Sequence, residues 1–165
     1  MGGEYNFTTM ITVNKSVTVY LLKTCGNRTE VCLGMKRVGY GKGKWNGFGG
    51  KIEKGETPGQ AAIRELNEES GIVTQMSNLQ KMAEILYHEP TEDWYVHVFV
   101  CNKWVGNPAK SDEMIPRWFE VGNIPYNEMW ENDALWLPKV LEGNSTKCVV
   151  WNNAGGKMLR YKIVS

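Results

Sequence analysis

One stretch of 23 residues, from 50 to 72, constrains the fold of this chain more than any other. It reads GKIEKGETPGQAAIRELNEESGI and carries the marks of a helix with two defined ends. Thr57 is a good N-cap, Pro58 suits the first helical position, and Gln60 completes a capping box. Gly71 suits the position just past the C-terminus. The stretch therefore predicts a glycine-rich loop followed by a helix from about Thr57 to just before Gly71.

The predicted helix carries a group of three carboxylates. Glu65, Glu68 and Glu69 are spaced i, i+3 and i+4, so a helix places all three on one face. Neighbouring like charges repel one another, but hard divalent cations such as Mg²⁺ prefer oxygen ligands and bridge carboxylates to phosphates. For such a triplet alone, a solvated acidic face is the commoner interpretation, and the metal site gains support only from the rest of the stretch.

The whole stretch fits the pattern G-x5-E-x7-R-E-U-x-E-E-x-G-U, in which U is a bulky aliphatic residue. The defined positions are occupied by Gly50, Glu56, Arg64, Glu65, Leu66, Glu68, Glu69, Gly71 and Ile72. At ordinary residue frequencies a chance match at one start point is on the order of 1 in 10^8. The chain thus resembles the Nudix hydrolases, which cleave a nucleoside diphosphate linked to a further group. This resemblance implies a metal-dependent pyrophosphohydrolase.

The remaining chain reads as strands around a second helix. We expect strands at residues 10–23, 30–36, 83–86 and 95–101, a closing hairpin at 147–151 and 158–163, and a helix at 128–141. The glycine-rich residues 39–50 read as a loop. This order predicts an α/β chain with a mixed sheet sandwiched between helices, which the resemblance implies as the Nudix fold. We expect one domain over residues 1–165, with the polar residues 1–8 flexible.

Composition limits the partners and the cellular location. The net charge is +1, which favours neither a nucleic-acid polymer nor a membrane surface as partner. No signal peptide or membrane-length apolar run is visible, so we expect the cytoplasm, with the nucleus and mitochondrion left open. The four cysteines form no CxxC pair and read as free thiols. We expect a monomer.

A closer resemblance lies outside the 23-residue stretch. Residues 31–53, 96–101 and 106–130, with the following ENDALWLP, resemble the animal MutT homologues, a group of oxidised purine nucleoside triphosphatases. This resemblance implies hydrolysis of 8-oxo-dGTP and 2-hydroxy-dATP to monophosphate and pyrophosphate, with Mg²⁺ as cofactor and Mn²⁺ as a substitute. The substrate would be a small nucleotide.

The resemblance also implies the metal and catalytic residues. Glu65, Glu68, Glu69 and Glu113 would serve as metal ligands and catalytic carboxylates, one of them activating water. Gly49 and Gly50 would bring backbone close to the metal and the phosphates. Arg64 and Glu56 would pair, pinning the loop to the helix, and Gly71 would end the helix.

A base pocket follows from the same resemblance. Its matching positions are Thr18, Lys36, Tyr40, Asn46, Tyr87, Trp130, Asn132 and Asp133. Trp130 would stack on the purine, Tyr40 would keep an aromatic wall, and Asn46 would offer both donors and an acceptor to the base edge. Lys36 would reach phosphate or close the pocket floor. The alternative for Trp130 is an ordinary core residue.

One position departs from the group. The MutT homologues have adjacent aspartates facing the base, whereas this chain has Asn132 before Asp133. Since an asparagine cannot titrate, we expect altered or narrower base selectivity, with oxidised guanine retained and the dATP lesion disfavoured. Two other readings stay open: a Nudix enzyme for another substrate, such as O6-methyl-dGTP or a nucleotide sugar, or a non-catalytic nucleotide-binding module. The second reading would be marked by loss of motif carboxylates, and all are present.

Overall fold

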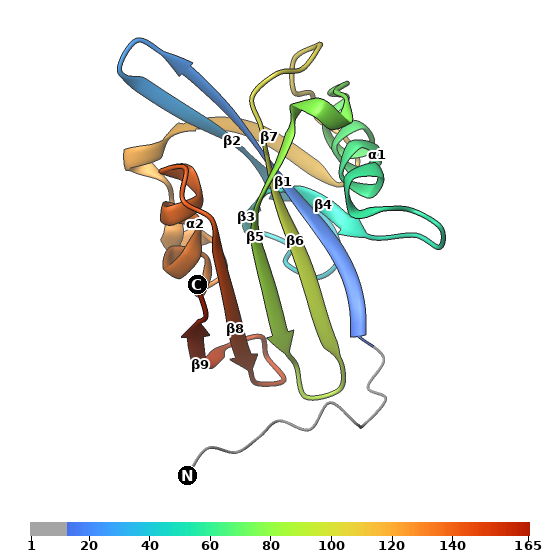
Figure 1. The fold of residues 1–165 in the computed structure, drawn as a ribbon, viewed down its shortest axis with the longest axis vertical. Helices are drawn as coiled ribbons and strands as arrows, with labels where there is room; N and C mark the ends of the chain where they lie inside the picture. Colours follow the sequence, from blue (N-terminus) through green and yellow to red (C-terminus); the bar gives the residue numbers. More distant parts are fainter. Residues whose placement is uncertain (1–12) are drawn as a thin grey trace.

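The computed structural model describes residues 13–165, so the expectations for residues 1–8 and for the strand start at 10–12 lie outside it. Nine strands form one mixed sheet, and a helix packs on each face (Figure 1). This arrangement confirms the predicted α/β fold class. The strands are β1 (Val13–Cys25), β2 (Arg28–Lys36), β3 (Trp45–Asn46), β4 (Phe48–Lys51), β5 (Leu79–His88), β6 (Asp93–Cys101), β7 (Met114–Glu120), β8 (Thr146–Asn152) and β9 (Met158–Ile163). The helices are α1 (Pro58–Ser70) and α2 (Asp133–Leu141), with 3-10 turns at Met76–Asn78, Val121–Asn123 and Tyr126–Glu128.

The strand order is β3-β2-β1-β6-β5-β8-β9, with β4 added beside β1 and β7 beside β2. The pairs β1–β6 and β5–β8 are parallel, and the other pairs are antiparallel. Because side chains alternate along a strand, each central strand supplies both faces of the sheet. Val17, Val19 and Leu21 of β1 pack on the α1 side, whereas Tyr20 packs on the α2 side. The two helices therefore cover two separate hydrophobic cores.

β1 changes its partner halfway along its length. Residues 21–25 pair with β2, and residues 16–19 pair with β4. β2 continues beside β7 and β3, so the glycine-rich segment around β3 and β4 lies between the diverging β1 and β2. Helix α1 packs on β4, β1 and β7. Strand divergence thus brings the loop backbone against the acidic helix.

Three sequence expectations were wrong in detail. β4 lies inside the predicted glycine-rich loop, because backbone pairing with β1 forms a strand despite the weak strand preference of glycine. β7 was not predicted, and its Pro116 is tolerated because β7 pairs only with β2 and is an edge strand. The second helix begins at Asp133, five residues later than predicted, since residues 126–128 form a 3-10 turn. No helix within residues 13–165 is long and apolar enough to cross a membrane.

Candidate active site

Helix α1 begins and ends as its sequence predicts. The Thr57 hydroxyl accepts from the Gln60 backbone N–H at 3.2 Å, and the Gln60 side chain accepts from the Thr57 N–H at 2.9 Å. Gly71 lies past the last turn with φ of 75°, a left-handed conformation that favours glycine. Leu66 is fully buried in the core on the α1 side. The fixed helix ends and this buried residue set the rotation of the acidic face.

An arginine clamp ties the loop to the helix. Arg64 donates to Glu56 through Nε at 2.6 Å and Nη2 at 2.9 Å, as expected from the sequence. Arg64 also donates to the Lys51 carbonyl at 3.0 Å and to Glu65 at 2.8 Å. The paired guanidinium holds the pKa of Glu56 down to about 2, so this carboxylate stays ionised. Arg64 and Glu56 therefore hold the loop in place against helix α1.

Glu69 belongs to the acidic face and is almost completely buried, with 2% exposure. Its Oε1 accepts from the Gly49 backbone N–H at 2.7 Å. Its Oε2 lies 3.9 Å from the Lys36 Nζ, and Lys36 lies 3.3 Å from the Glu113 carboxylate. The structure thus brings Gly49, Lys36, Glu69 and Glu113 together, and places Lys36 at the carboxylates rather than at the floor of the base pocket.

Burial sets the protonation of these glutamates. Burial raises the pKa of Glu69 to about 7, opposed by the Gly49 hydrogen bond and the Lys36 charge, and aided by the charges of Glu65 and Glu113. Burial also raises the pKa of Glu65, with the Arg64 hydrogen bond opposing it. A carboxyl group tuned toward neutral pH can exchange a proton or bind a cation in that range.

The carboxylates do not form a finished metal cage. Within residues 13–165, no three Asp, Glu, His or Cys side chains converge closely enough to hold a metal ion. The carboxylates are instead drawn to separate partners: Glu65 and the exposed Glu68 both accept from Arg64, whereas Glu69 accepts from the Gly49 N–H.

The donor set nevertheless fits a divalent cation. Glu69 Oε2 is buried without a hydrogen-bond partner, so one oxygen ligand is already desolvated and uncommitted. A Cβ added to Gly50 would lie 2.4 Å from Glu65 Oε1, so any side chain at this position would displace this carboxylate. Oxygen donors of this kind suit Mg²⁺.

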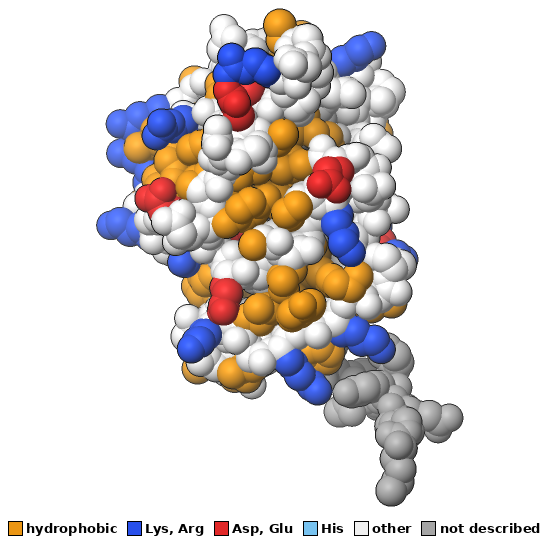
Figure 2. Space-filling model, turned by 90° about the vertical axis from the view of Figure 1, so that its left-hand side faces the viewer, with side chains coloured by type: hydrophobic (Ala, Val, Ile, Leu, Met, Phe, Trp, Pro, Cys, Tyr) orange, Lys and Arg blue, Asp and Glu red, His pale blue; other side chains and the backbone are white. Residues whose placement is uncertain are grey.

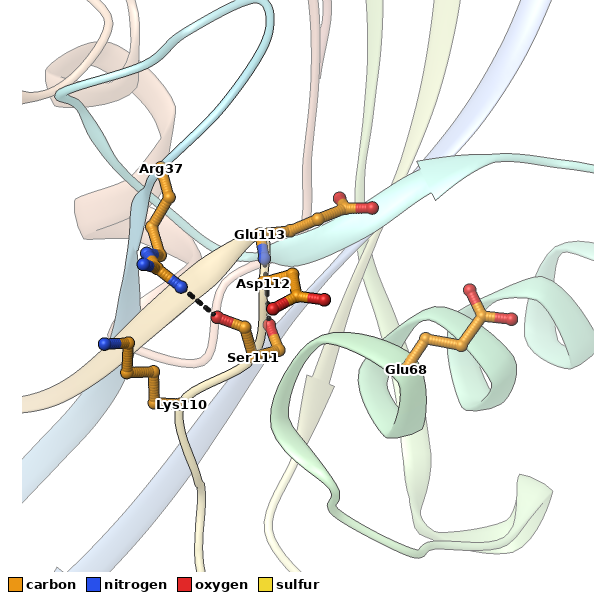
Figure 3. A pocket seen from close by; sticks show the side chains of 6 residues that line it. All are labelled: Arg37, Glu68, Lys110, Ser111, Asp112 and Glu113. Carbon is orange, nitrogen blue, oxygen red and sulfur yellow. Dashed lines mark hydrogen bonds between the residues drawn. The ribbon is translucent and has the colours of Figure 1, made fainter.

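A polar hollow of about 700 Å³ opens beside this group (Figure 3). Its lining residues are Arg37, Glu68, Lys110, Ser111, Asp112 and Glu113. Glu68 lines the hollow from α1, Arg37 directly follows β2, and the other residues come from the segment before β7. One carboxylate of the helix, Glu68, therefore borders an open, charged space large enough for phosphate groups.

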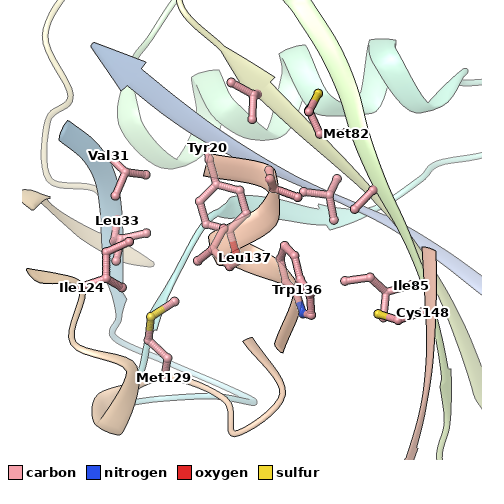
Figure 4. Close-up of a cluster of buried hydrophobic side chains, with 14 of the residues drawn as sticks. Tyr20, Val31, Leu33, Met82, Ile85, Ile124, Met129, Trp136, Leu137 and Cys148 are labelled. Carbon is pink, nitrogen blue, oxygen red and sulfur yellow. The ribbon is translucent and has the colours of Figure 1, made fainter. Parts of the chain in front are cut away.

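Apart from Lys36, the predicted base-pocket residues lie toward the other side of the sheet, with α2. Figure 4 shows Trp136 of α2 between Tyr20 and the β5–β8 residues Ile85 and Cys148. Trp136 is 2% exposed, and its ring meets Tyr20 edge to face at 6.0 Å. Neither Tyr20 nor Trp136 was assigned to the pocket from the sequence, although the period-two pattern of β1 places Tyr20 on this face.

Asn132 is the most constrained polar side chain of this region. Its Oδ1 accepts from the Tyr87 hydroxyl at 2.9 Å and from Trp136 Nε1 at 3.2 Å. Since both partners are donors, the oxygen must face them, and the amide NH₂ points elsewhere. Asn132 therefore makes no cap for α2 with its side chain and offers only donors to a ligand.

Asp133, the next residue, is buried with 5% exposure. Burial raises its pKa to about 7, opposed by the Trp130 backbone and the Lys44 charge. Its charge in turn raises the pKa of Tyr20 and of Tyr87, after burial itself. Asp133 is therefore a buried carboxyl group directly beside Asn132 that titrates near neutral pH.

Trp130 is covered on one face by the loop between β2 and β3. The Tyr40 ring stacks on it at 4.9 Å, with 23° between the planes, although Tyr40 is 73% exposed. Lys44 Nζ lies 5.0 Å from the Trp130 ring. One face of the Trp130 ring is therefore already occupied by Tyr40.

This side of the molecule is largely apolar at its centre with charges around it (Figure 2). A hollow of about 560 Å³ borders Trp130, lined by Lys44, Tyr126, Asn127, Met129, Trp130, Glu131, Gly155, Gly156 and Lys157. It offers an aromatic ring together with lysine charges, groups that suit a base and an anion.

Thr18 and Asn46 lie where the two halves of the site meet. Thr18 pairs with Gly49 across β1 and β4, so a pocket residue is directly opposite a residue of the metal side. Asn46 donates through Nδ2 to the Lys44 carbonyl at 3.0 Å. One donor of Asn46 is thus already used, which corrects the expectation that both donors are free for the base.

Comparison with known proteins gives the family. Residues 14–140 match the model of the NUDIX domain. The chain is 46% identical over 131 residues to "Oxidized purine nucleoside triphosphate hydrolase" of Danio rerio, covering 78% of this chain and 81% of the relative. It is 42% identical over 115 residues to the protein of the same name from Mus musculus, covering 68% and 72%. The crystal structure of the mutator MutT protein from Bacillus halodurans superposes with a TM-score of 0.76 at 20% identity, covering 92% of this chain and 98% of that one. The chain therefore belongs to the Nudix hydrolase family.

Proposed function

We propose that this protein hydrolyses oxidised purine nucleoside triphosphates, with 8-oxo-dGTP as its main substrate, to monophosphate and pyrophosphate in the presence of Mg²⁺. The single observation that carries the chemistry is Glu69, which is buried on the acidic face, accepts a hydrogen bond from Gly49 and keeps one oxygen without a hydrogen-bond partner. The relatives named as oxidised purine nucleoside triphosphate hydrolases support the substrate class.

The residues of the site have separate roles in binding the metal, positioning the loop and balancing the phosphate charge. Glu65, Glu68, Glu69 and Glu113 would hold Mg²⁺, which when bound neutralises phosphate charge and lowers the pKa of an attacking water. Arg64 and Glu56 keep the loop against α1, so that the Gly49 N–H and the Glu69 carboxylate stay aligned. Lys36, between Glu69 and Glu113, places a positive charge beside the phosphates.

The hydrogen-bonding groups of the base pocket favour binding of an oxidised guanine over an oxidised adenine. Guanine presents the O6 acceptor where adenine presents the N6 amino donor. Asn132 offers only its NH₂ group, because Tyr87 and Trp136 both donate to its oxygen. A donor at this position pairs with O6 and leaves an adenine amino group facing another donor, a mismatch that costs about 1–3 kcal/mol when buried. Asp133, when ionised, accepts from the neighbouring N–H groups of guanine.

The test is turnover of 8-oxo-dGTP and 2-hydroxy-dATP with Mg²⁺, with products separated by chromatography. We expect monophosphate and pyrophosphate, no turnover in EDTA, and kcat/KM at least about tenfold higher for 8-oxo-dGTP. Asn132→Asp should narrow this ratio. Equal efficiencies for the two substrates, unchanged by Asn132→Asp, would remove the role of Asn132 in selectivity.

We further propose that the protein acts as a monomer in the cytoplasm. The modest net charge of +1 supports a protein that binds small nucleotides and no nucleic-acid polymer or membrane. Light scattering and imaging of a tagged chain in cells check these two points.

A further inference from the structure

The hollow beside the acidic helix contains two cations that the proposed reaction does not yet use. Arg37 and Lys110 lie together on the side across from Glu68 (Figure 3). Glu113, which approaches Lys36 at 3.3 Å, belongs to the same hollow. The two cations therefore border the space that leads outward from the carboxylates.

Arg37 is held in place by the segment that carries Glu113. Its backbone N–H donates to the Glu113 carbonyl at 2.8 Å, and its Nη1 donates to the Ser111 carbonyl at 2.8 Å. Within residues 13–165 this is the only hydrogen bond of the Arg37 side chain, and Arg37 forms no ion pair there. The guanidinium is thus anchored at one corner, and its other N–H groups stay available to a ligand.

The charges of the hollow explain what it can accept. Glu68, Asp112 and Glu113 contribute three negative charges against the two positive charges of Arg37 and Lys110. Without a metal ion this balance does not attract an anion. Once Glu68 and Glu113 hold a divalent cation, the same space becomes positive and has a fork-shaped donor suited to phosphate oxygens. The hollow is therefore an anion site that requires metal.

We propose that Arg37 and Lys110 bind the terminal phosphates of the triphosphate substrate, and the pyrophosphate released from it. The inference rests on the proposed function, since it assumes a metal-bound polyphosphate. Arg37 is the anchored contact, and the exposed Lys110 adds a second positive charge at the same hollow.

The first test is calorimetric binding of inorganic pyrophosphate with and without Mg²⁺. We expect Mg²⁺-dependent binding that weakens about tenfold in Arg37→Gln and in Lys110→Gln. Lys42→Gln is the matched control, because exposed Lys42 lies in the same loop as Arg37, has the same charge and does not line the hollow. Its affinity should change less than about twofold. Unchanged affinity in Arg37→Gln, or equal losses in all three variants, would overturn the assignment.

The second test separates binding of phosphates from a structural role. In hydrolysis of plain dGTP, Arg37→Gln should raise KM about tenfold and leave kcat within about twofold, since the contact exists in ground and transition states alike. Arg37→Lys should recover part of the affinity. A fall in kcat with unchanged KM would contradict the inference. Because pyrophosphate and dGTP carry no oxidised base, loss of 8-oxo-dGTP preference would refute the proposed substrate and leave this result standing.

Discussion

Replacing Glu69 by glutamine should make the metal-free protein less sensitive to rising pH. Burial raises the pKa of Glu69 to about 7, above the ordinary 4.5 expected of the unfolded chain. A folded-state pKa above the unfolded one means that the folded protein keeps its proton longer. Stability is therefore lost as pH rises from 4.5 through 7, the opposite of a salt-bridged carboxylate.

The size of this effect follows from the two pKa values. A shift from 4.5 to about 7 corresponds to about 3 kcal/mol once both states are ionised. Between pH 5 and pH 8 the part still to be lost is about 2.5 kcal/mol. Glu69→Gln removes this charge and keeps an oxygen for the Gly49 N–H. Relative to wild type, the variant should therefore gain about 2.5 kcal/mol more at pH 8 than at pH 5.

Urea unfolding in EDTA at both pH values measures this difference, since other titrating groups cancel between wild type and variant. Glu68→Gln is the matched control, one residue earlier on the same helix with a side chain 57% exposed. The difference in unfolding free energy between Glu68→Gln and wild type should be nearly the same at pH 5 and pH 8. If the change in unfolding free energy caused by Glu69→Gln were equal at pH 5 and pH 8, the raised pKa of Glu69 would be refuted. Glu69→Gln should also lose most of the hydrolase activity, because the Glu69 carboxylate that destabilises the fold when ionised is also a proposed metal ligand.

Three further perturbations probe the supporting contacts. Gly50→Ala places a methyl group 2.4 Å from Glu65 Oε1, so kcat/KM should fall at least about tenfold with only a small change in thermal stability; an active variant would show that the approach is not needed. Glu56→Gln should flatten the acid side of the stability profile, because a pKa lowered to about 2 supplies stability that is lost as pH falls from 4.5 to 2; acid titration followed by circular dichroism checks this, and an unchanged profile would contradict it. Tyr87→Phe removes one of two donors to Asn132 Oδ1 and should cost about 1 kcal/mol of stability while reducing the preference for 8-oxo-dGTP; denaturation and substrate competition measure both, and unchanged selectivity would show that Trp136 alone orients the amide.

Local sequence signals predicted the helix of the site well. The cap residues Thr57, Gln60 and Gly71 act within a few positions of one another, so their contacts appear in the sequence itself. The pairing of Arg64 with Glu56 was likewise expected, since both belong to one pattern. Contacts between residues that are close together in the sequence can therefore be predicted from the sequence alone.

Contacts between distant segments were not predictable in the same way. Pairing with β1 turns a glycine-rich loop into β4, and no local preference indicates it. The orientation of the Asn132 side chain depends on Tyr87, which lies in strand β5, far from Asn132 in the sequence. Arg37 and Lys110 are far apart in the sequence and meet only because β2 pairs with β7. These features follow from tertiary packing, which residue periodicity does not encode.

The central claim is tested most directly by the ratio of kcat/KM for 8-oxo-dGTP to that for dGTP, measured with Mg²⁺ and with Glu69→Gln as the inactive control. We predict a ratio well above about ten, with both activities lost in the control. A ratio near one would leave the protein a Nudix hydrolase but contradict the assignment of oxidised purines. Activity retained in Glu69→Gln would contradict the role given to the buried carboxylate.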